Sequence, residues 1–290
     1  MNEPKRHHYV PRFYLRRFTN TNGQLWIWDR HRDKIFLTTP EKVAAENHFY
    51  HQADLLAHGH DPLTMEKQLA EIETDTAAIT GQWVDWLRQT EPRKQIEIPP
   101  INREIVALFL ALQFLRTADT REILSLVAGA AEAKAPITTQ EARRLHTELL
   151  WDEETVNRLA KRITGCVWIF ARNKTAKPYA TSDNPVAFRT GDNLQWVKRG
   201  IYAPGTYVVY PLAPDIMMYC HPKDSPFDRL EQFDRALSPV EITSSLISSE
   251  NSAQVFMASR FVISPCNDFE EAKQFAKTIG TDTYKPQSQP

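Results

Sequence analysis

CVWIFAR, residues 166–172, is the first of a series of short apolar runs that decide the fold class of this chain. Three more follow it: TYVVYPL at 206–212, IMMYCH at 216–221 and RFVISP at 260–265. Proline, glycine, asparagine and aspartate separate these runs, and such residues form turns. Short apolar runs bounded by turn residues are typical of β-strands, so we predict a strand-rich second half of the chain.

Two strand-like runs also occur near the N-terminus, QLWIWD at 24–29 and KIFLTT at 34–39. The charged residues RHRD at 30–33 separate them, and this arrangement predicts a β-hairpin. We expect the hairpin to join the later strands in one sheet.

The region between the hairpin and the later strands has a helical period instead. Asp61-Pro62 predicts the start of the first helix, because aspartate caps helices and proline suits the first turn. One packing seam follows at spacings of four and three, through Met65, Leu69, Ile72, Thr76, Ile79, Trp83 and Trp86. A second helix from about residue 102 is apolar nearly all round over 105–115, which predicts a buried central helix. A third helical region is expected over 138–163.

These elements predict an α+β fold, with a mixed, mainly antiparallel sheet and a flanking or inserted bundle of long helices. We expect one domain over residues 1–280, with the helical layer at about 62–163 and the strand-rich part at about 164–265. Residues 281–290 are expected to form a polar tail. The alternative is a division into two domains near residue 164.

Composition limits the class of protein. The chain has 290 residues with 42% hydrophobic content, enough for a substantial core, and a net charge of −1, which argues against coating nucleic acid through bulk positive charge. Its three cysteines are far apart and form no disulfide or zinc pattern. The longest apolar stretch, 105–112, is too short to cross a bilayer. We therefore expect a cytoplasmic protein without a membrane partner.

The opening HHYVPRFYLRRF, residues 7–18, predicts a functional site near the N-terminus. His7 and His8 are candidate catalytic groups because imidazole titrates near neutral pH. Arg12 is a candidate substrate-binding residue, since guanidinium binds phosphate and carboxylate groups in a fork geometry. The aromatic residues of this segment predict that it is ordered and packed. The alternative is that the histidines lie on the surface or satisfy a buried network.

A second candidate site is the turn Ser182-Asp183-Asn184-Pro185, which follows a strand-like segment. Asp183 is a candidate catalytic base or metal ligand, and Asn184 is a candidate substrate-binding residue. If a metal takes part, an aspartate ligand indicates a divalent ion such as Mg²⁺ or Mn²⁺. The alternative is that these side chains only satisfy the backbone of the turn.

Gln113 and Arg116 form a polar stripe on the apolar second helix, and both are candidate substrate-binding residues. A buried guanidinium must be paired, either with a substrate phosphate or with a structural carboxylate such as Glu66 or Glu73 of the preceding helix. Structural pairing is the favoured reading. A further histidine cluster at 48–61 lacks zinc-site spacing and reads as a solvated loop.

The opening HHYVPRFYLRRF, the segment LQFLRT at 112–117 and TSDNPV at 181–186 together resemble a bacterial family classed as a domain of unknown function. The resemblance extends from about residue 7 to about residue 264. It implies a setting in mobile-element loci and phage defence but supplies no catalytic mechanism.

The residues and the resemblance together predict a phage-defence effector that hydrolyses phosphate esters, as a nuclease with a His/Asp/Arg site. Its partners would then be nucleic acid or a phage component. The competing hypothesis is a non-catalytic sensor or protein-binding module, with Trp26, Trp28, Trp196 and Tyr202 as exposed contact residues. Convergence of His7 or His8, Arg116 and Asp183 in one pocket would favour the enzyme, and their dispersal would favour the binding module.

Overall fold

The structure is a computed structural model that describes residues 6–47, 63–92, 94–121, 124, 138–192, 195–198, 204–223 and 228–279. The helix start at Asp61-Pro62, the histidine cluster at 48–61, Tyr202 and the tail 281–290 lie outside these residues. The fold is α+β with mainly antiparallel sheets, as the sequence predicts.

The larger sheet follows the order β13-β6-β11-β10-β8-β9 within the described ranges. Its strands are β6 (Val167–Asn173), β8 (Ala187–Arg189), β9 (Trp196–Val197), β10 (Tyr207–Ala213), β11 (Ile216–His221) and β13 (Pro239–Ile242). All neighbours pair antiparallel except β13, which runs parallel to β6. The apolar runs at 166–172, 206–212 and 216–221 thus form its centre, where every residue of β6 and β10 is buried.

The N-terminal hairpin belongs to a second sheet, which corrects the expectation of a single one. Its strand order is β3-β2-β14-β7, with β2 (Leu25–Asp29), β3 (Lys34–Thr38), β14 (Phe261–Ser264) and β7 (Thr181–Ser182). Trp28 is directly opposite Val262 in this sheet and lies in a separate apolar cluster with Val255 and Phe269. The hairpin therefore buries its second face against α8 and α9 instead of extending the larger sheet.

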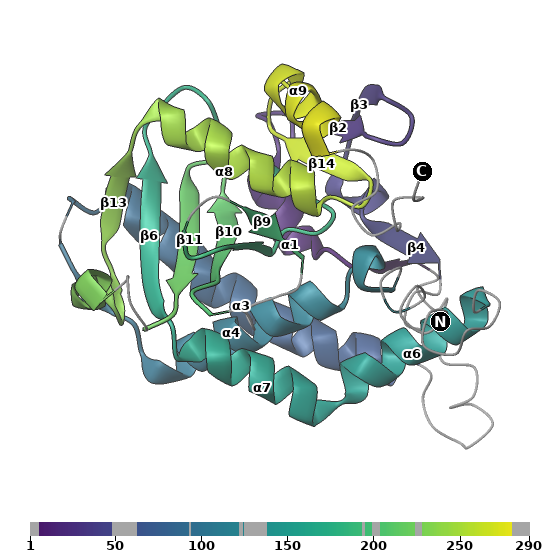
Figure 1. The fold of residues 1–290 in the computed structure, drawn as a ribbon, viewed down its shortest axis with the longest axis horizontal. Coiled ribbons are helices and arrows are strands. Elements are labelled where there is room, and N and C mark those ends of the chain that lie inside the picture. Colours follow the sequence, from purple (N-terminus) through teal and green to yellow (C-terminus); the bar gives the residue numbers. More distant parts are fainter. Residues whose placement is uncertain are drawn as a thin grey trace.

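Helices cover both faces of the larger sheet (Figure 1). α3 (Thr64–Gln89) and α4 (Pro100–Leu115) pack on one face, where the Trp83 ring contacts the rings of Trp168 and Phe170 in β6. α8 (Ser244–Met257) crosses the other face, and α9 (Glu270–Ile279) lies beside β2 and β14. Shorter elements complete the chain: β1 (Arg6–His8), α1 (Arg12–Leu15), η1 (Arg16–Phe18), η2 (Pro40–Lys42), β4 (Ala45–Asn47), β5 (Ile96–Glu97), η3 (Asp228–Phe233) and β12 (Ala236–Leu237).

The seam of α3 is confirmed over most of its length, but its last member is not buried. Met65, Leu69 and Trp83 are buried, whereas Trp86 is 43% exposed and Leu87 is buried in its place. A strict four-three spacing repeats every 3.5 residues while an α-helix turns every 3.6, so the seam drifts around the helix by about 20° per heptad. After three heptads the buried face has moved by one residue.

The helical region predicted over 138–163 is two helices, α6 (Thr139–Trp151) and α7 (Glu153–Thr164). Asp152 separates them, and its carboxylate accepts hydrogen bonds from the backbone N–H groups of Glu154 and Thr155. This N-cap starts a new helix in a different direction, because the capping residue leaves the helical backbone conformation.

The opening segment is ordered and packed, as its aromatic residues predict. Tyr14, Leu15 and Phe18 are fully buried, and Phe13 is partly buried against Phe109 of α4. In the described part of the chain, no helix combines the length and the apolar character needed to cross a bilayer.

Candidate functional site

Three segments that are distant in the sequence meet at one place. The hydroxyl of Tyr14 lies 2.6 Å from Oγ1 of Thr181, which joins the opening segment to the Ser-Asp-Asn-Pro turn. Nε2 of Gln113 in α4 donates to the carbonyl of Tyr9 at 3.0 Å. The opening segment is therefore in contact with both the Ser-Asp-Asn-Pro turn and the central helix α4.

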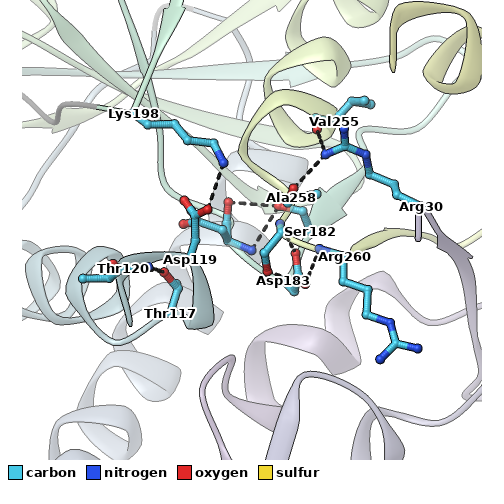
Figure 2. Close-up of polar contacts among 12 residues, drawn as sticks. Arg30, Thr117, Asp119, Thr120, Ser182, Asp183, Lys198, Val255, Ala258 and Arg260 are labelled. Atoms are coloured by element: carbon cyan, nitrogen blue, oxygen red, sulfur yellow. Dashed lines mark hydrogen bonds and ion pairs between the residues drawn. The ribbon is translucent and has the colours of Figure 1, made fainter. Parts of the chain in front are cut away.

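A buried ion pair between Asp119 and Lys198 lies beside the Ser-Asp-Asn-Pro turn (Figure 2). Nζ of Lys198 lies 2.9 Å from Oδ1 of Asp119, and the two side chains are only 8% and 6% exposed. Nδ2 of Asn184 donates to the other carboxylate oxygen of Asp119 at 3.0 Å. Asp119 comes from the short helical stretch that begins at residue 118, just after α4, and Lys198 directly follows β9, so the pair exists only in the folded chain. Neither residue is among the candidates named from the sequence.

Asn184 leaves one polar atom beside this ion pair unsatisfied. The residue is 1% exposed, yet its Oδ1 accepts no hydrogen bond from any described residue. A buried polar atom without a partner is costly and needs an explanation, such as a bound water or a ligand. Because Nδ2 of Asn184 donates to Asp119, Oδ1 of the same amide group is a hydrogen-bond acceptor close to the Asp119–Lys198 ion pair.

A second set of contacts holds the turn that carries Asn184. The hydroxyl of Ser182 donates to Oε1 of Gln254 in α8 at 2.9 Å and accepts from the backbone N–H of Asn184 at 3.2 Å. Nε2 of Gln254 donates to the carbonyl of Pro185 at 3.0 Å. Because Ser182 and Gln254 are both fully buried, the turn has little freedom to move.

Asp183 is engaged by the chain segment that precedes β14. Its carboxylate accepts from the hydroxyl and N–H of Ser259 and from the N–H groups of Arg260 and Phe261, at 2.9–3.1 Å. Burial raises the pKa of Asp183 to about 6, although these hydrogen bonds act in the opposite direction. A metal ion at Asp183 would have to displace this set of donors, so the contacts favour a structural role for this side chain.

Two arginines lie next to the carboxylates. Arg30 donates to the carbonyls of Val255 and Ala258 at the C-terminal end of α8, at 2.9 and 2.7 Å (Figure 2). Burial lowers the pKa of Arg30, while the nearby carboxylates of Asp183 and Asp119 raise it. These contacts place a positive charge close to both aspartates.

Arg260 provides the more accessible of the two guanidinium groups. It forms an ion pair with Asp29 at 2.7 Å and keeps 36% of its side chain exposed. The Asp29 pairing raises the pKa of Arg260, and Tyr9 and Asp183 add to this effect. The opening segment, Asp183 and Arg260 are thus close enough to interact electrostatically.

The histidine and arginine candidates form a neighbouring network on α3. Nε2 of His7, a residue 1% exposed in β1, lies 2.9 Å from Oε2 of Glu66. Arg116, likewise 1% exposed, pairs with Oε1 of Glu73 at 2.6 Å and also donates to Oε1 of Gln113. Structural pairing of Arg116 with a glutamate of α3 is therefore confirmed.

The structure separates the roles that the sequence assigned to one site. His7 and Arg116 contact carboxylates of α3, whereas Asp183 contacts the segment before β14. His8 is half-buried, and Arg12 is exposed at the start of α1. Asn184 is the sequence candidate that contacts the Asp119–Lys198 ion pair.

Two of the aromatic residues expected to be exposed have other surroundings. Trp28 is only 4% exposed, because it packs in the apolar cluster under α9. Trp196 is half-buried, and the guanidinium of Arg189 lies 4.5 Å from the centroid of its ring.

Asp119 and Lys198 were not identifiable by the usual patterns. Asp119 lies in the polar segment RTADT at 116–120, where Thr117 and Thr120 are also buried and hydrogen-bonded to each other. A polar segment directly after an apolar helix is a sequence signal that includes Asp119. Lys198 belongs to no motif, and only the fold shows its partner.

Comparison with known proteins identifies a family for most of the chain. A family model described as "Protein of unknown function (DUF4238)" matches residues 6–267. No curated protein and no solved structure matches the chain. Over the described ranges, no group of three or more histidine, cysteine, aspartate or glutamate side chains is arranged to hold a metal ion.

Proposed function

The chain belongs to the family DUF4238, and because that family is described only by its unknown function, we propose a function from the site itself. We propose that the protein hydrolyses phosphate esters and that its substrate is a nucleic acid. The phage-defence setting implied by the sequence resemblance is part of this proposal. The observation that carries it is the buried Asp119–Lys198 pair with the open acceptor of Asn184 beside it.

The pair supplies the two kinds of group that phosphate-ester hydrolysis needs. An ammonium group can stabilise the negative charge that develops on the leaving oxygen and donate a proton to it. A carboxylate next to it can accept a proton from an attacking water. Nδ2 of Asn184 donates to Asp119 and fixes the orientation of that carboxylate. Oδ1 of Asn184 is then available to accept a hydrogen bond from the attacking water.

In the proposed reaction, Asp119 and Lys198 carry out both proton transfers. Water attacks phosphorus and gives one proton to Asp119, while the bond from phosphorus to the leaving oxygen breaks. Lys198 donates a proton to that leaving oxygen. The proton on Asp119 then returns to Lys198 across their 2.9 Å contact, which restores the starting state. Arg260, whose side chain is partly exposed beside its partner Asp29, is proposed to bind a more distant phosphate of the substrate.

Several sequence candidates remain part of the proposal in supporting roles. His8 and Arg12 are proposed to contact the substrate, because they are the least buried of the candidates in the opening segment. His7, Gln113 and Arg116 would hold that segment against α3 and α4. The dependence of hydrolysis on a divalent metal is tested by adding Mg²⁺ or Mn²⁺ and by removing metal ions with EDTA.

We expect Asp119→Asn to lower the rate of nucleic-acid cleavage by about 100-fold, the usual contribution of a general base. Asparagine has the same shape as aspartate but cannot accept the proton from water. The assay uses end-labelled single- and double-stranded RNA and DNA, each with EDTA, Mg²⁺ or Mn²⁺. Asp215→Asn is the matched control, because Asp215 forms a part-exposed pair with Arg88 at the β10–β11 turn.

Equal cleavage by the wild type and Asp119→Asn would exclude Asp119 as the base. Absence of cleavage with every nucleic acid under all three conditions would refute the hydrolase. If the protein then still bound a nucleic acid or a phage protein, the competing sensor hypothesis would be supported.

A further inference from the structure

Lys198 directly follows a short hairpin whose position decides where its ammonium group lies. β8 and β9 form this hairpin, with Phe188 opposite Val197 and Arg189 opposite Trp196. Lys198 is the next residue after β9. Any displacement of the hairpin therefore moves Lys198 away from Asp119.

The hairpin is attached to α8 by polar contacts from both of its strands. From β8, Arg189 pairs with Oε1 of Glu250 at 3.3 Å and donates to Oγ of Ser249 at 3.1 Å. From β9, Nε1 of Trp196 donates to Oγ of Ser252 at 2.7 Å. The Arg189 guanidinium also lies over the Trp196 ring, so one arginine connects the two strands and the helix.

We propose that Arg189 and Glu250 are positioning residues, which dock the β8–β9 hairpin on α8 and thereby hold Lys198 against Asp119. The effect of docking on catalysis rests on the proposed function. The docking itself does not, because it can be measured without an activity assay. β9 lies beside α8 in the fold, as this role requires (Figure 1).

The docking pair is buried but not fully satisfied. Glu250 is 5% exposed, and neither its Oε2 nor Nε of Arg189 has a hydrogen-bond partner within the described ranges. Burial raises the pKa of Glu250 to about 7, while Arg189 and the hydroxyl of Tyr219 lower it. Tyr179 and Tyr207 are neutral neighbours, since burial raises the pKa of each hydroxyl.

The remaining titratable group at this face is His221, whose ring lies 4.3 Å from that of Tyr207. Burial lowers the pKa of His221 to about 4, so this imidazole stays neutral at physiological pH. Burial also raises the pKa of the Tyr219 hydroxyl. Among the described residues in contact with the pair, Arg189 and Glu250 carry the charge, Lys198 being paired with Asp119, and Glu250 titrates near pH 7.

The direction of the pH effect follows from proton linkage. In the docked hairpin Glu250 binds its proton more tightly than it would if undocking exposed it to water, where a glutamate titrates near 4.3. Protonation of Glu250 therefore favours docking, and the docked state is progressively destabilised as the pH rises from about 4.3 through about 7, above which the effect levels off. Between pH 6 and pH 8.5 the undocked fraction is expected to rise about tenfold.

Hydrogen exchange of the amides in residues 187–198 tests the docking, after correction for the intrinsic pH dependence of exchange. In the wild type we expect exchange about tenfold faster at pH 8.5 than at pH 6. Glu250→Gln should abolish this difference, because glutamine fills the same space without titrating. Glu241→Gln is the matched control: Glu241 pairs with Arg172 at the opposite edge of the sheet, so the difference should persist.

Acetylation of Lys198 by a small active ester at pH 8, followed by mass spectrometry, tests the positioning. Lys198 is 8% exposed in the docked state, so we expect Arg189→Ala to increase its acetylation rate at least fivefold. Faster hairpin exchange with an unchanged Lys198 rate would overturn the positioning role. A pH difference that survives in Glu250→Gln would overturn the assignment to Glu250. If these results hold but no substrate is cleaved, only the proposed hydrolase fails.

Discussion

Alanine in place of Asp183 is expected to lower the free energy of unfolding by about 3 kcal/mol, because it leaves buried donors without an acceptor. The carboxylate accepts bonds from Ser259, Arg260 and Phe261, the residues that join α8 to β14. Without it, three backbone N–H groups lose their acceptor at a point where water has little access. Urea unfolding followed by tryptophan fluorescence at pH 7.5 measures the loss.

Asp183→Asn is the informative companion variant. Its amide oxygen can still accept some of these hydrogen bonds, while its NH₂ group faces donors, so it should retain part of the lost stability. The alternative prediction from the sequence is that Asp183→Ala removes activity with little effect on the fold. An Asp183→Ala protein as stable as the wild type would refute the structural role and support a catalytic one.

Arg116→Ala is expected to lower the free energy of unfolding by about 4 kcal/mol, the usual result of removing one partner of a buried ion pair. Glu73, which is only 25% exposed, would lose its guanidinium partner, and Gln113 would lose the donors to its Oε1. The empty space beside Phe109 adds a cavity cost, because the guanidinium lies over that ring.

The matched control is Arg144→Ala on α6. Arg144 pairs with Glu148 at a similar distance of 2.6 Å, but both side chains are more than half exposed. Exposed pairs contribute about 0.5 kcal/mol or less, so urea unfolding should hardly change. Equal losses in the two variants would show that burial of the Arg116 pair has no energetic consequence.

The sequence predicts those parts of the fold that depend on local pattern. The β2–β3 hairpin, the buried strands β6, β10 and β11 and the course of α4 all follow from periodicity and turn residues. The pairing of Arg116 with a glutamate of α3 follows from the cost of a buried charge. Such inferences need no knowledge of how distant segments meet.

The separation of the six-stranded sheet from the four-stranded sheet and the Asp119–Lys198 pair depend on tertiary contacts. β14 pairs with β2 on one side and β7 on the other, and no local signal predicts this choice of partners. Lys198 acquires its carboxylate partner from a residue 79 positions earlier. The donors to Asp183 are backbone N–H groups, which every residue except proline carries, so the identity of residues 259–261 gives no indication of them.

The place of β14 between β2 and β7 also has a consequence for biosynthesis. β2 lies near the start of the chain and receives its neighbour β14 only after residues 261–264 have left the ribosome. Until then β2 has one paired edge, and Trp28 lacks the Val262 side of its apolar cluster. A strand can form its native pairs only when its partner strand has been synthesised. β2 is therefore synthesised early but acquires its second neighbour late. Between the synthesis of β2 and that of β14 the nascent chain therefore exposes an open strand edge, a surface on which a chaperone would act.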